Sequence, residues 1–259
     1  MPAQLLSTSH GQTMVLTLSN PEYRNALGPE IYAAGVEALN AADNNPEVRS
    51  VVITGEGTQF CAGGNLQRLL DNRAQPPQVQ AESIDALHSW IETIRSFPKP
   101  VIAAVEGAAA GAGFSLCLAC DMVVAARSAF FVMAYSNVGL SCDGGASWAL
   151  ARSLPRQLVN ELLMLGTRIS AERLHALGVV NQLCSDGQAL AAALELAAQL
   201  NSRAPNVMAS LKELVSEADS SDLHSQLARE RSQFVDNLHH PNAAEGISAF
   251  LGKRPPLYP

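Results

Sequence analysis

The apolar residues follow two patterns over the first two thirds of the chain. Short apolar runs that end in turn residues predict β-strands, and stretches with an apolar residue every three or four positions predict amphipathic helices. The expected strands lie at residues 13–19, 50–57 and 99–107, with two more within 121–134. The expected helices lie at residues 24–45, 83–97 and 110–119. The polar segment 71–80 contains two adjacent prolines and is predicted to be a mobile surface loop.

Strands and helices alternate in this way to about residue 182, and that alternation is typical of crossover connections in an α/β protein with a mostly parallel sheet. From residue 187 onward the pattern is almost entirely helical. We therefore expect a strand-containing core over residues 1–185 and a helical C-terminal subdomain over residues 186–259, which is not an independent domain.

Composition and charge narrow the class of protein. The chain has 259 residues, 47% of them hydrophobic, which is enough for one large domain with a sizeable core. Its formal net charge is -7 and no run of Lys or Arg is long enough to follow a phosphate backbone, so nucleic acid is not an expected partner. No apolar stretch is long enough to cross a bilayer, and residues 1–20 lack a secretory pattern, so we expect no membrane partner and a cytoplasmic location.

Five cysteines, an odd number, do not indicate a disulfide framework. Cys117 and Cys120 form a C-x-x-C spacing, which could belong to a zinc site or a redox pair. The pair lies inside an apolar run and far from the histidines, so we expect buried, inert thiols and no metal site.

Two glycine-rich turns follow predicted strands. "FCAGGNL" contains Gly63 and Gly64, and "EGAAAGAGFS" contains Gly111 and Gly113. Neither has the spacing of a nucleotide-binding loop. Such turns let a ligand approach main-chain N–H groups, and two converging N–H donors form an oxyanion hole. The other interpretation is that small residues only permit tight packing of a helix on a strand.

A single carboxylate, Asp143, lies in "GLSCDGGASW" just before a predicted helix. Aspartate is among the best helix N-caps, so Asp143 could cap that helix. The alternative is that Asp143 accepts a proton from a substrate. Two other acidic residues at strand ends, Glu106 and Asp121, are expected to have structural roles.

These motifs resemble those of the crotonase superfamily of enoyl-CoA hydratases and isomerases. The resemblance rests on "NPEYRNAL", "FCAGGNL", "KPVIAAVEGAAAGAGFSLCLACDMVVAA", "AYSNVGLSCDGGASWALARSLP" and "FLGKRPP", which occur in the family's order from about residue 10 to the C-terminus. It implies a crotonase-like spiral of ββα units and a C-terminal helical region that trimerises, as a homotrimer or a dimer of trimers. It also implies an acyl-CoA substrate in fatty acid metabolism, with coenzyme A bound as part of the substrate and no permanent cofactor.

The resemblance also assigns roles to residues of the predicted site. Gly64 and Ala112 match the two positions whose N–H groups form the oxyanion hole. Ala62 and Asn65 lie in the same first turn and are expected to contact the substrate. Arg24 and Ala26 are expected near the coenzyme, and Lys253 is expected to reach it from the C-terminal region.

The chain departs from the family's hydratases where they carry two glutamates. Those positions hold Ser115 and Tyr135, which cannot act as carboxylate bases. Tyr135 is expected to line the acyl pocket or orient the substrate, and Ser115 to form a local hydrogen bond. Asp143 instead matches the aspartate of a subgroup that includes dienoyl-CoA isomerases, epoxide isomerases acting on phenylacetyl-CoA, and an aryl-CoA dehalogenase. The resemblance thus favours double-bond or ring isomerisation with Asp143 as acid and base. A weak hydratase and a catalytically silent acyl-CoA-binding subunit remain the alternatives.

Overall fold

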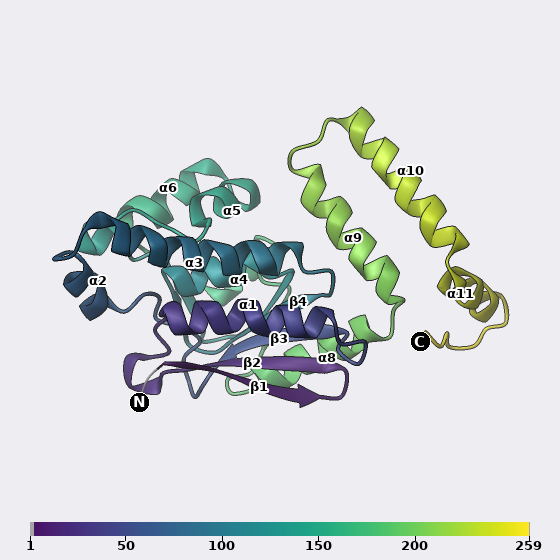
Figure 1. Cartoon of the computed structure of the whole chain (residues 1–259), viewed down its shortest axis with the longest axis horizontal. Coiled ribbons are helices and arrows are strands. Elements are labelled where there is room, and N and C mark those ends of the chain that lie inside the picture. The colour runs from purple at the N-terminus through teal and green to yellow at the C-terminus, as the bar shows by residue number, and fades with distance from the viewer. Residues whose placement is uncertain (1–2, 259) are drawn as a thin grey trace.

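The computed structural model describes residues 3–258, which are built around a six-stranded sheet (Figure 1). The strands of this sheet, in spatial order, are β1 (Gln4–His10), β2 (Thr13–Ser19), β3 (Ser50–Gly55), β4 (Val101–Val105), β6 (Met122–Ala126) and β9 (Gln182–Cys184). The β1–β2 pair is antiparallel and every other pair is parallel. The carboxyl ends of the parallel strands therefore meet at one edge of the sheet, and both glycine turns lie beyond that edge.

A second, three-stranded sheet continues from the first. It contains β5 (Ala108–Ala110), β7 (Phe130–Val132) and β8 (Arg168–Ser170), with β5 parallel to β7 and β7 antiparallel to β8. Strands β4 and β5 follow each other in the chain and lie in different sheets, as do β6 and β7. Helix α4 (Ala112–Ala119) follows β5, so the chain here forms the ββα unit that was expected.

Successive side chains of a strand point to opposite faces of the sheet, so the buried strands give the larger sheet two apolar faces. Helices cover both of these faces. Leu16, Ile53 and Ala103 belong to the main core beneath α1 (Pro29–Asp43) and α3 (Pro77–Ser96). Their neighbours, such as Val52 and Ile102, pack on the other side against alanines of α8 (Ala189–Asn201). The remaining core elements are η1 (Pro21–Tyr23), α2 (Leu66–Asn72), η2 (Ser136–Val138), α5 (Ala146–Ser153), α6 (Arg156–Leu165) and α7 (Ala171–Ala176).

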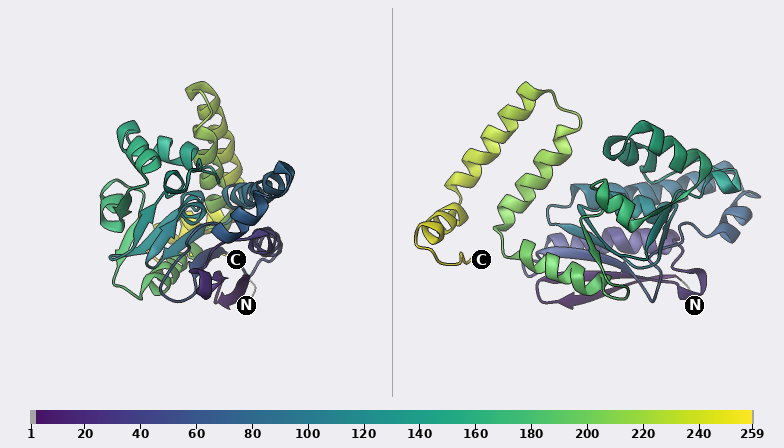
Figure 2. Two further views of the ribbon diagram at one scale, coloured as in Figure 1. Left: turned by 90° about the vertical axis from the view of Figure 1, so that its left-hand side faces the viewer. Right: turned by 180° about the vertical axis from the view of Figure 1, so that it is seen from behind.

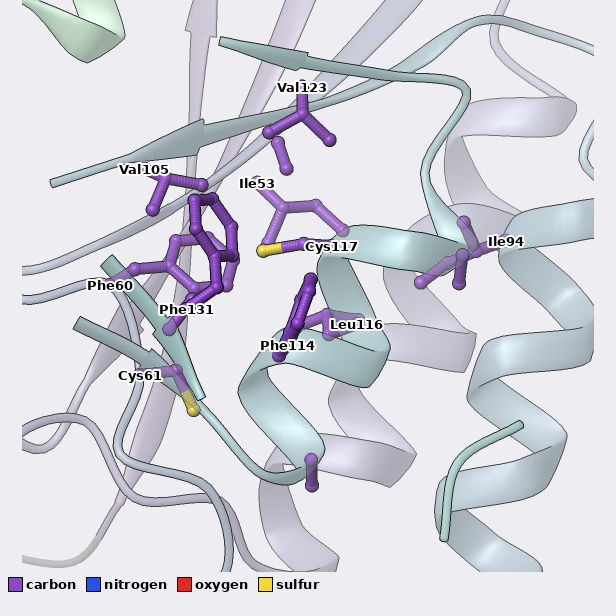
Figure 3. Packing of buried hydrophobic residues seen from close by; sticks show 14 of the residues in the cluster. Ile53, Phe60, Cys61, Ile94, Val105, Phe114, Leu116, Cys117, Val123 and Phe131 are labelled. Carbon is purple, nitrogen blue, oxygen red and sulfur yellow. The ribbon is translucent and has the colours of Figure 1, made fainter. Parts of the chain in front are cut away.

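Phenylalanine and cysteine side chains pack beneath the second glycine turn (Figure 3). The rings of Phe114 and Phe131 lie with centroids 4.9 Å apart and planes at 54°. Cys117 is fully buried between them and the sheet, and burial raises the pKa of its thiol well above the ordinary value. Burial also raises the pKa of the half-buried Cys120 thiol, and both cysteines are free. The predicted burial is therefore confirmed for Cys117 and only partly for Cys120, and the inertness of both thiols stays a prediction.

Helices α1 and α3 cross at a glycine. A Cβ atom added to Gly35 of α1 would lie 2.3 Å from Cε2 of Trp90, whose side chain is fully buried in α3. Because no side chain can enter that space, the close crossing of the two helices depends on glycine at this position.

Replacing Gly35 with alanine is expected to lower the free energy of unfolding by about 2 kcal/mol, since overpacking a tight core costs roughly 1–3 kcal/mol. Urea unfolding followed by far-UV circular dichroism measures the change. Alanine normally favours a helix over glycine by about 1 kcal/mol, so without the Trp90 contact the same substitution would raise the free energy of unfolding. A gain in stability would show that the Trp90 contact does not restrict the crossing.

The C-terminal helices α9 (Pro205–Ala218), α10 (Leu223–His239) and α11 (Pro241–Leu251) form an arm that projects away from the core (Figures 1 and 2). The arm exposes large apolar side chains, including Val215, Phe234, Phe250 and Leu251.

Lys212 attaches α9 to the core, because its ammonium lies 2.8 Å from Oδ2 of Asp121 and donates to the carbonyl of Ile94 at 2.9 Å. The structural role predicted for Asp121 is confirmed, since the same oxygen accepts from the N–H of Val101 at 2.7 Å.

Several boundaries differ from those predicted. Strand β2 was predicted with its observed limits, but the first helix begins at Pro29 instead of residue 24, because proline favours the first helical turn and Gly28 before it is extended. The predicted loop 71–80 is wrong at both ends: α2 runs to Asn72 and α3 begins at Pro77. Strands β1, β5, β8 and β9 were not predicted, because three of them have only three residues and β1 is mostly exposed.

Within residues 3–258, no helix has both the length and the apolar character to span a membrane.

Candidate active site

A cavity of about 880 Å³ opens beside the two glycine turns. Helices α1, α2, α3 and the start of α4 contribute to its wall, together with the segment 134–147. Much of the wall is apolar, from side chains such as Leu27, Leu69, Ile84 and Leu87. This lining suits an acyl group, and a few polar groups interrupt it.

Main-chain pairing places the two glycine turns side by side. The N–H of Cys61 donates to the carbonyl of Ala108 at 3.0 Å, and the N–H of Ala110 donates to the carbonyl of Cys61 at 2.8 Å. Gly63 has a φ of +89°, and a Cβ atom at this position would lie 2.7 Å from the carbonyl oxygen of Ala110 and 3.4 Å from the nitrogen of Ala112. The contact therefore requires glycine at 63, and it brings Gly64 next to the beginning of α4.

Gly64 and Ala112 both line the cavity. Throughout the described part of the chain, neither of their main-chain N–H groups donates to a backbone or side-chain acceptor. Ala112 is the first residue of α4, so its N–H lies at the positive end of the helix dipole. Both N–H groups are therefore available to a carbonyl oxygen that gains negative charge, and their convergence on one oxygen stays a prediction.

Asp143 is half-buried and lines the same cavity. Its side chain does not cap α5; the capping position is Gly145, with a φ of +75° and no side-chain hydrogen bond, so the capping hypothesis is wrong. The main chain of Asp143 is fixed instead, because its carbonyl accepts from Oγ of Ser115 at 3.0 Å and from the N–H of Ala146 at 3.2 Å. The carboxylate is held by the hydroxyl of Tyr135, which donates to Oδ1 at 2.5 Å.

Tyr135 remains a donor over a wide pH range. Burial raises the pKa of its hydroxyl above the ordinary value, and the neighbouring charge of Asp143 raises it further. A deprotonated Tyr135 would place two negative charges side by side in a half-buried site. The tyrosine therefore orients Asp143 by a hydrogen bond and does not act as a base.

His88 is a site residue that the sequence interpretation missed. It lies on α3 and lines the cavity, and its Nε2 accepts a hydrogen bond from the N–H of Gly144 at 3.4 Å. This contact ties α3 to the segment that carries Asp143. The signal in the sequence was a histidine on the apolar face formed by Ile84, Leu87 and Ile91.

The structure distributes the other predicted residues over four places: the cavity wall, the adjoining turn, the region below the Asp143 loop and the C-terminal arm. Ala62 and Asn65 line the cavity, and Oδ1 of Asn65 also accepts from the N–H of Arg68 at 3.1 Å and so caps α2. Arg24 and Ala26 lie in the adjoining turn, where the carbonyl of Arg24 accepts from the N–H of Ala62 at 2.9 Å, but neither lines the cavity.

Two further predicted residues lie outside the cavity wall. Ser115 is buried beneath the Asp143 loop. A Cβ atom added to Gly144 of that loop would lie 2.8 Å from the Cβ atom of Ser115. Lys253 follows α11 at the end of the C-terminal arm.

Glu106 has the structural role expected, since its Oε1 accepts from the N–H of Ala189 at the start of α8 at 2.8 Å. Over residues 3–258, no group of three or more His, Cys, Asp or Glu side chains is arranged to hold a metal ion.

Comparisons with known proteins show which proteins the chain is similar to. Residues 9–259 match the family described as enoyl-CoA hydratase/isomerase. The 1,2-epoxyphenylacetyl-CoA isomerase of Escherichia coli (strain K12) is 35% identical over 255 residues, which cover 98% of this chain and 97% of that protein. The carnitinyl-CoA dehydratase of Salmonella typhimurium is 34% identical over 263 residues, which cover 100% of this chain and 99% of that protein.

Solved structures give the same result. The crystal structure of an enoyl-CoA hydratase from Polaromonas sp. JS666 has a TM-score of 0.98 and 70% sequence identity, and the match covers 98% of this chain and 99% of that one. An enoyl-CoA hydratase from Bacillus anthracis matches with a TM-score of 0.91 and 26% identity, over 99% of this chain and 98% of that one. The predicted fold class is therefore confirmed.

Proposed function

The chain belongs to the enoyl-CoA hydratase/isomerase family, and we propose that within this family of acyl-CoA enzymes it is an isomerase with Asp143 as its acid and base. One observation carries the proposal. Among the residues of the described chain that line the cavity, Asp143 is the only carboxylate, and it shares that cavity with the N–H groups of Gly64 and Ala112. The proposed substrate is a 3-enoyl thioester of coenzyme A, and no permanently bound cofactor is required.

The reaction moves one proton and one double bond. The carboxylate of Asp143 removes a proton from Cα, and the electrons of that C–H bond form an enolate whose oxygen accepts hydrogen bonds from Gly64 and Ala112. Each donor of this kind lowers the barrier by about 3–4 kcal/mol. The protonated Asp143 then returns the proton to Cγ while the enolate collapses, which leaves the double bond between Cα and Cβ. One carboxylate is sufficient, since a single group removes and returns the proton.

Hydration is the second candidate, because two of the structural relatives above are named enoyl-CoA hydratases. Adding water to a 2-enoyl thioester requires a group that activates the water. The two positions at which the family's hydratases have glutamates hold Ser115, buried below the loop, and Tyr135, which donates to Asp143. This arrangement favours the isomerase, and a silent acyl-CoA-binding subunit is the third candidate.

An assay with three types of thioester separates these candidates. The purified protein is incubated with 3-hexenoyl-CoA, 2-hexenoyl-CoA and 1,2-epoxyphenylacetyl-CoA, and the products are separated by chromatography. Formation of 2-hexenoyl-CoA from the first, or a ring-isomerised product from the third, supports the isomerase. Formation of 3-hydroxyhexanoyl-CoA alone identifies a hydratase, and binding without turnover identifies a silent subunit.

The apolar arm suggests how the chain assembles. Three copies that pack their α9–α11 arms together would bury side chains such as Phe234, Phe250 and Leu251, so we include a homotrimer, or a dimer of trimers, in the proposal. Assembly of this kind would also allow Lys253 of one copy to approach coenzyme A bound to another. A cytoplasmic location and a role in fatty acid metabolism complete the proposed function.

Replacing Tyr135 with phenylalanine is expected to lower kcat for isomerisation about tenfold, because Asp143 loses the hydroxyl that orients its carboxylate. Stopped or continuous assays with 3-hexenoyl-CoA measure this change. Since the pKa of Tyr135 is raised by burial, the tyrosinate absorbance of the native protein at about pH 10 should be the same in the wild type and the variant. A wild type that shows one additional ionised tyrosine at that pH contradicts the protonation state assigned here.

A further inference from the structure

A positively charged side chain without an acidic partner lies in the wall of the cavity. Arg68 of α2 is half-buried and lines the cavity, and within residues 3–258 it makes no ion pair. Its Nη2 donates to Oγ of Ser83 on α3, which fixes the position of the guanidinium group. A half-buried cation held in place in this way has N–H groups left to bind an acceptor supplied by a ligand.

Tyr32 of α1 contributes a second donor next to Arg68. Its side chain is 5% exposed and lines the same cavity, and its hydroxyl has no hydrogen-bond partner in the described structure. Burial raises the pKa of Tyr32, while the nearby positive charge of Arg68 acts in the opposite direction. A protonated tyrosine and an arginine thus share one part of the wall.

Glu30 lies near Arg68 without forming an ion pair with it. Oε2 of Glu30 and Nη1 of Arg68 lie 3.0 Å and 3.2 Å from the position that a Cβ atom on Gly28 would take. The two groups do not come within ion-pair distance, and Glu30 is exposed to water. The carboxylate of Asp143 is engaged by Tyr135. The charges of Asp143 and Glu30 also act on Tyr32, but less than that of Arg68. Since Arg68 pairs with neither carboxylate, its guanidinium group can receive an anionic acceptor.

Arg68 lies in the first turn of α2, whose N-cap residue Asn65 directly follows the oxyanion residue Gly64. Gly64, Arg68 and Tyr32 all line the same cavity. A thioester bound at Gly64 with its acyl chain directed along α2 would approach this arginine. A group located several carbons from the thioester would thus meet Arg68 and Tyr32.

We propose that Arg68 and Tyr32 bind a carboxylate at the far end of the acyl group, so that the substrates are mono-thioesters of short dicarboxylic acids. A carboxylate can accept two parallel hydrogen bonds from a guanidinium group, and the Tyr32 hydroxyl supplies a further donor. The inference rests on the proposed acyl-CoA function and specifies its substrate class.

Binding of two saturated thioesters of equal chain length tests the inference without depending on turnover. Adipoyl-CoA and hexanoyl-CoA differ only in a terminal carboxylate or methyl group, and titration calorimetry gives a Kd for each. The wild type should bind adipoyl-CoA at least about tenfold more tightly. Arg68→Gln should reduce the ratio of the two Kd values to about one, and Tyr32→Phe should reduce it about threefold. Arg127→Gln, which removes an exposed arginine paired with Glu172, should leave the ratio unchanged.

The outcomes separate this inference from the proposed function. If both thioesters bind the wild type equally well, or if Arg68→Gln keeps the preference, the inference is wrong and the acyl-CoA function stands. If neither thioester binds, both are wrong. Because each variant is judged by a ratio of two ligands on the same protein, a partial loss of folded protein does not affect the result. If Arg68→Gln does not fold, an unchanged ratio in Tyr32→Phe overturns the inference.

Discussion

Replacing Asp143 with asparagine is expected to lower kcat for the conversion of 3-hexenoyl-CoA to 2-hexenoyl-CoA by at least about 10³-fold, since general acid–base catalysis contributes roughly 10²–10⁴-fold. An amide cannot take the Cα proton, and no other carboxylate in the described chain lines the cavity. The asparagine has nearly the same shape and can still accept the hydrogen bond from Tyr135. Steady-state kinetics and the affinity for hexanoyl-CoA should therefore show lost turnover with retained binding.

A matched control for this substitution is Asp85→Asn. Asp85 is an exposed residue of α3, one turn before His88, and it lies outside the cavity wall. The Asp85→Asn substitution removes the same charge from the same region of the protein. It should leave kcat within about twofold of the wild-type value, as expected for a surface substitution. If Asp143→Asn keeps more than a tenth of the wild-type kcat, Asp143 is not the acid and base of the reaction.

The second large effect concerns the glycine that joins the two turns. Gly63→Ala should lower kcat by on the order of 10²-fold, which is the loss expected when one oxyanion donor is misplaced. The added Cβ atom would lie 2.7 Å from the carbonyl of Ala110, so the first turn must move away from α4 and carry the N–H of Gly64 with it. Because the affected interaction forms with the enolate, the loss should appear in kcat more than in the affinity for a saturated acyl-CoA.

Gly178→Ala provides the control for backbone strain. Gly178 has a φ of +82°, close to the +89° of Gly63, but a Cβ atom there meets nothing within 4 Å. Both variants should lose stability from the left-handed conformation, by roughly 1 kcal/mol each. Only Gly63→Ala should lose catalysis. Equal kinetic losses in the two variants would mean that the contact between the turns does not position the donors.

The buried strands and the two glycine turns could be predicted because their signals are local. Strand β2 is a short apolar run that ends in polar residues, which predicts a strand. The turns of residues 61–64 and 111–113 combine small residues, and they belong to a series of motifs along the chain that resembles one family. The starts of α1 and α3 were placed less well. Each begins at a proline in the first helical turn, Pro29 and Pro77, and the hydrophobic periodicity used for the prediction does not mark that position.

The partners of Asp143 could not be predicted in the same way. The sequence alone left a helix cap and a proton acceptor as alternatives, and the structure excludes the cap because Gly145 occupies that position. His88 reaches the Asp143 loop from 56 positions earlier in the chain. Arg68 and Tyr32 come from two helices and share a wall that neither helix forms alone.

The sequence by itself determined the α/β class, the order of the main elements, the family, and the residue types available for acyl-CoA chemistry. These follow from periodicity and motif spacing, which neighbouring residues fix. Only the tertiary structure decided what surrounds each of those residues: the hydroxyl on Asp143, the two unpaired main-chain donors in the same cavity, and the arginine without an ion-pair partner. Such contacts join residues far apart in the chain, and their identity depends on how whole elements pack, which no local pattern encodes.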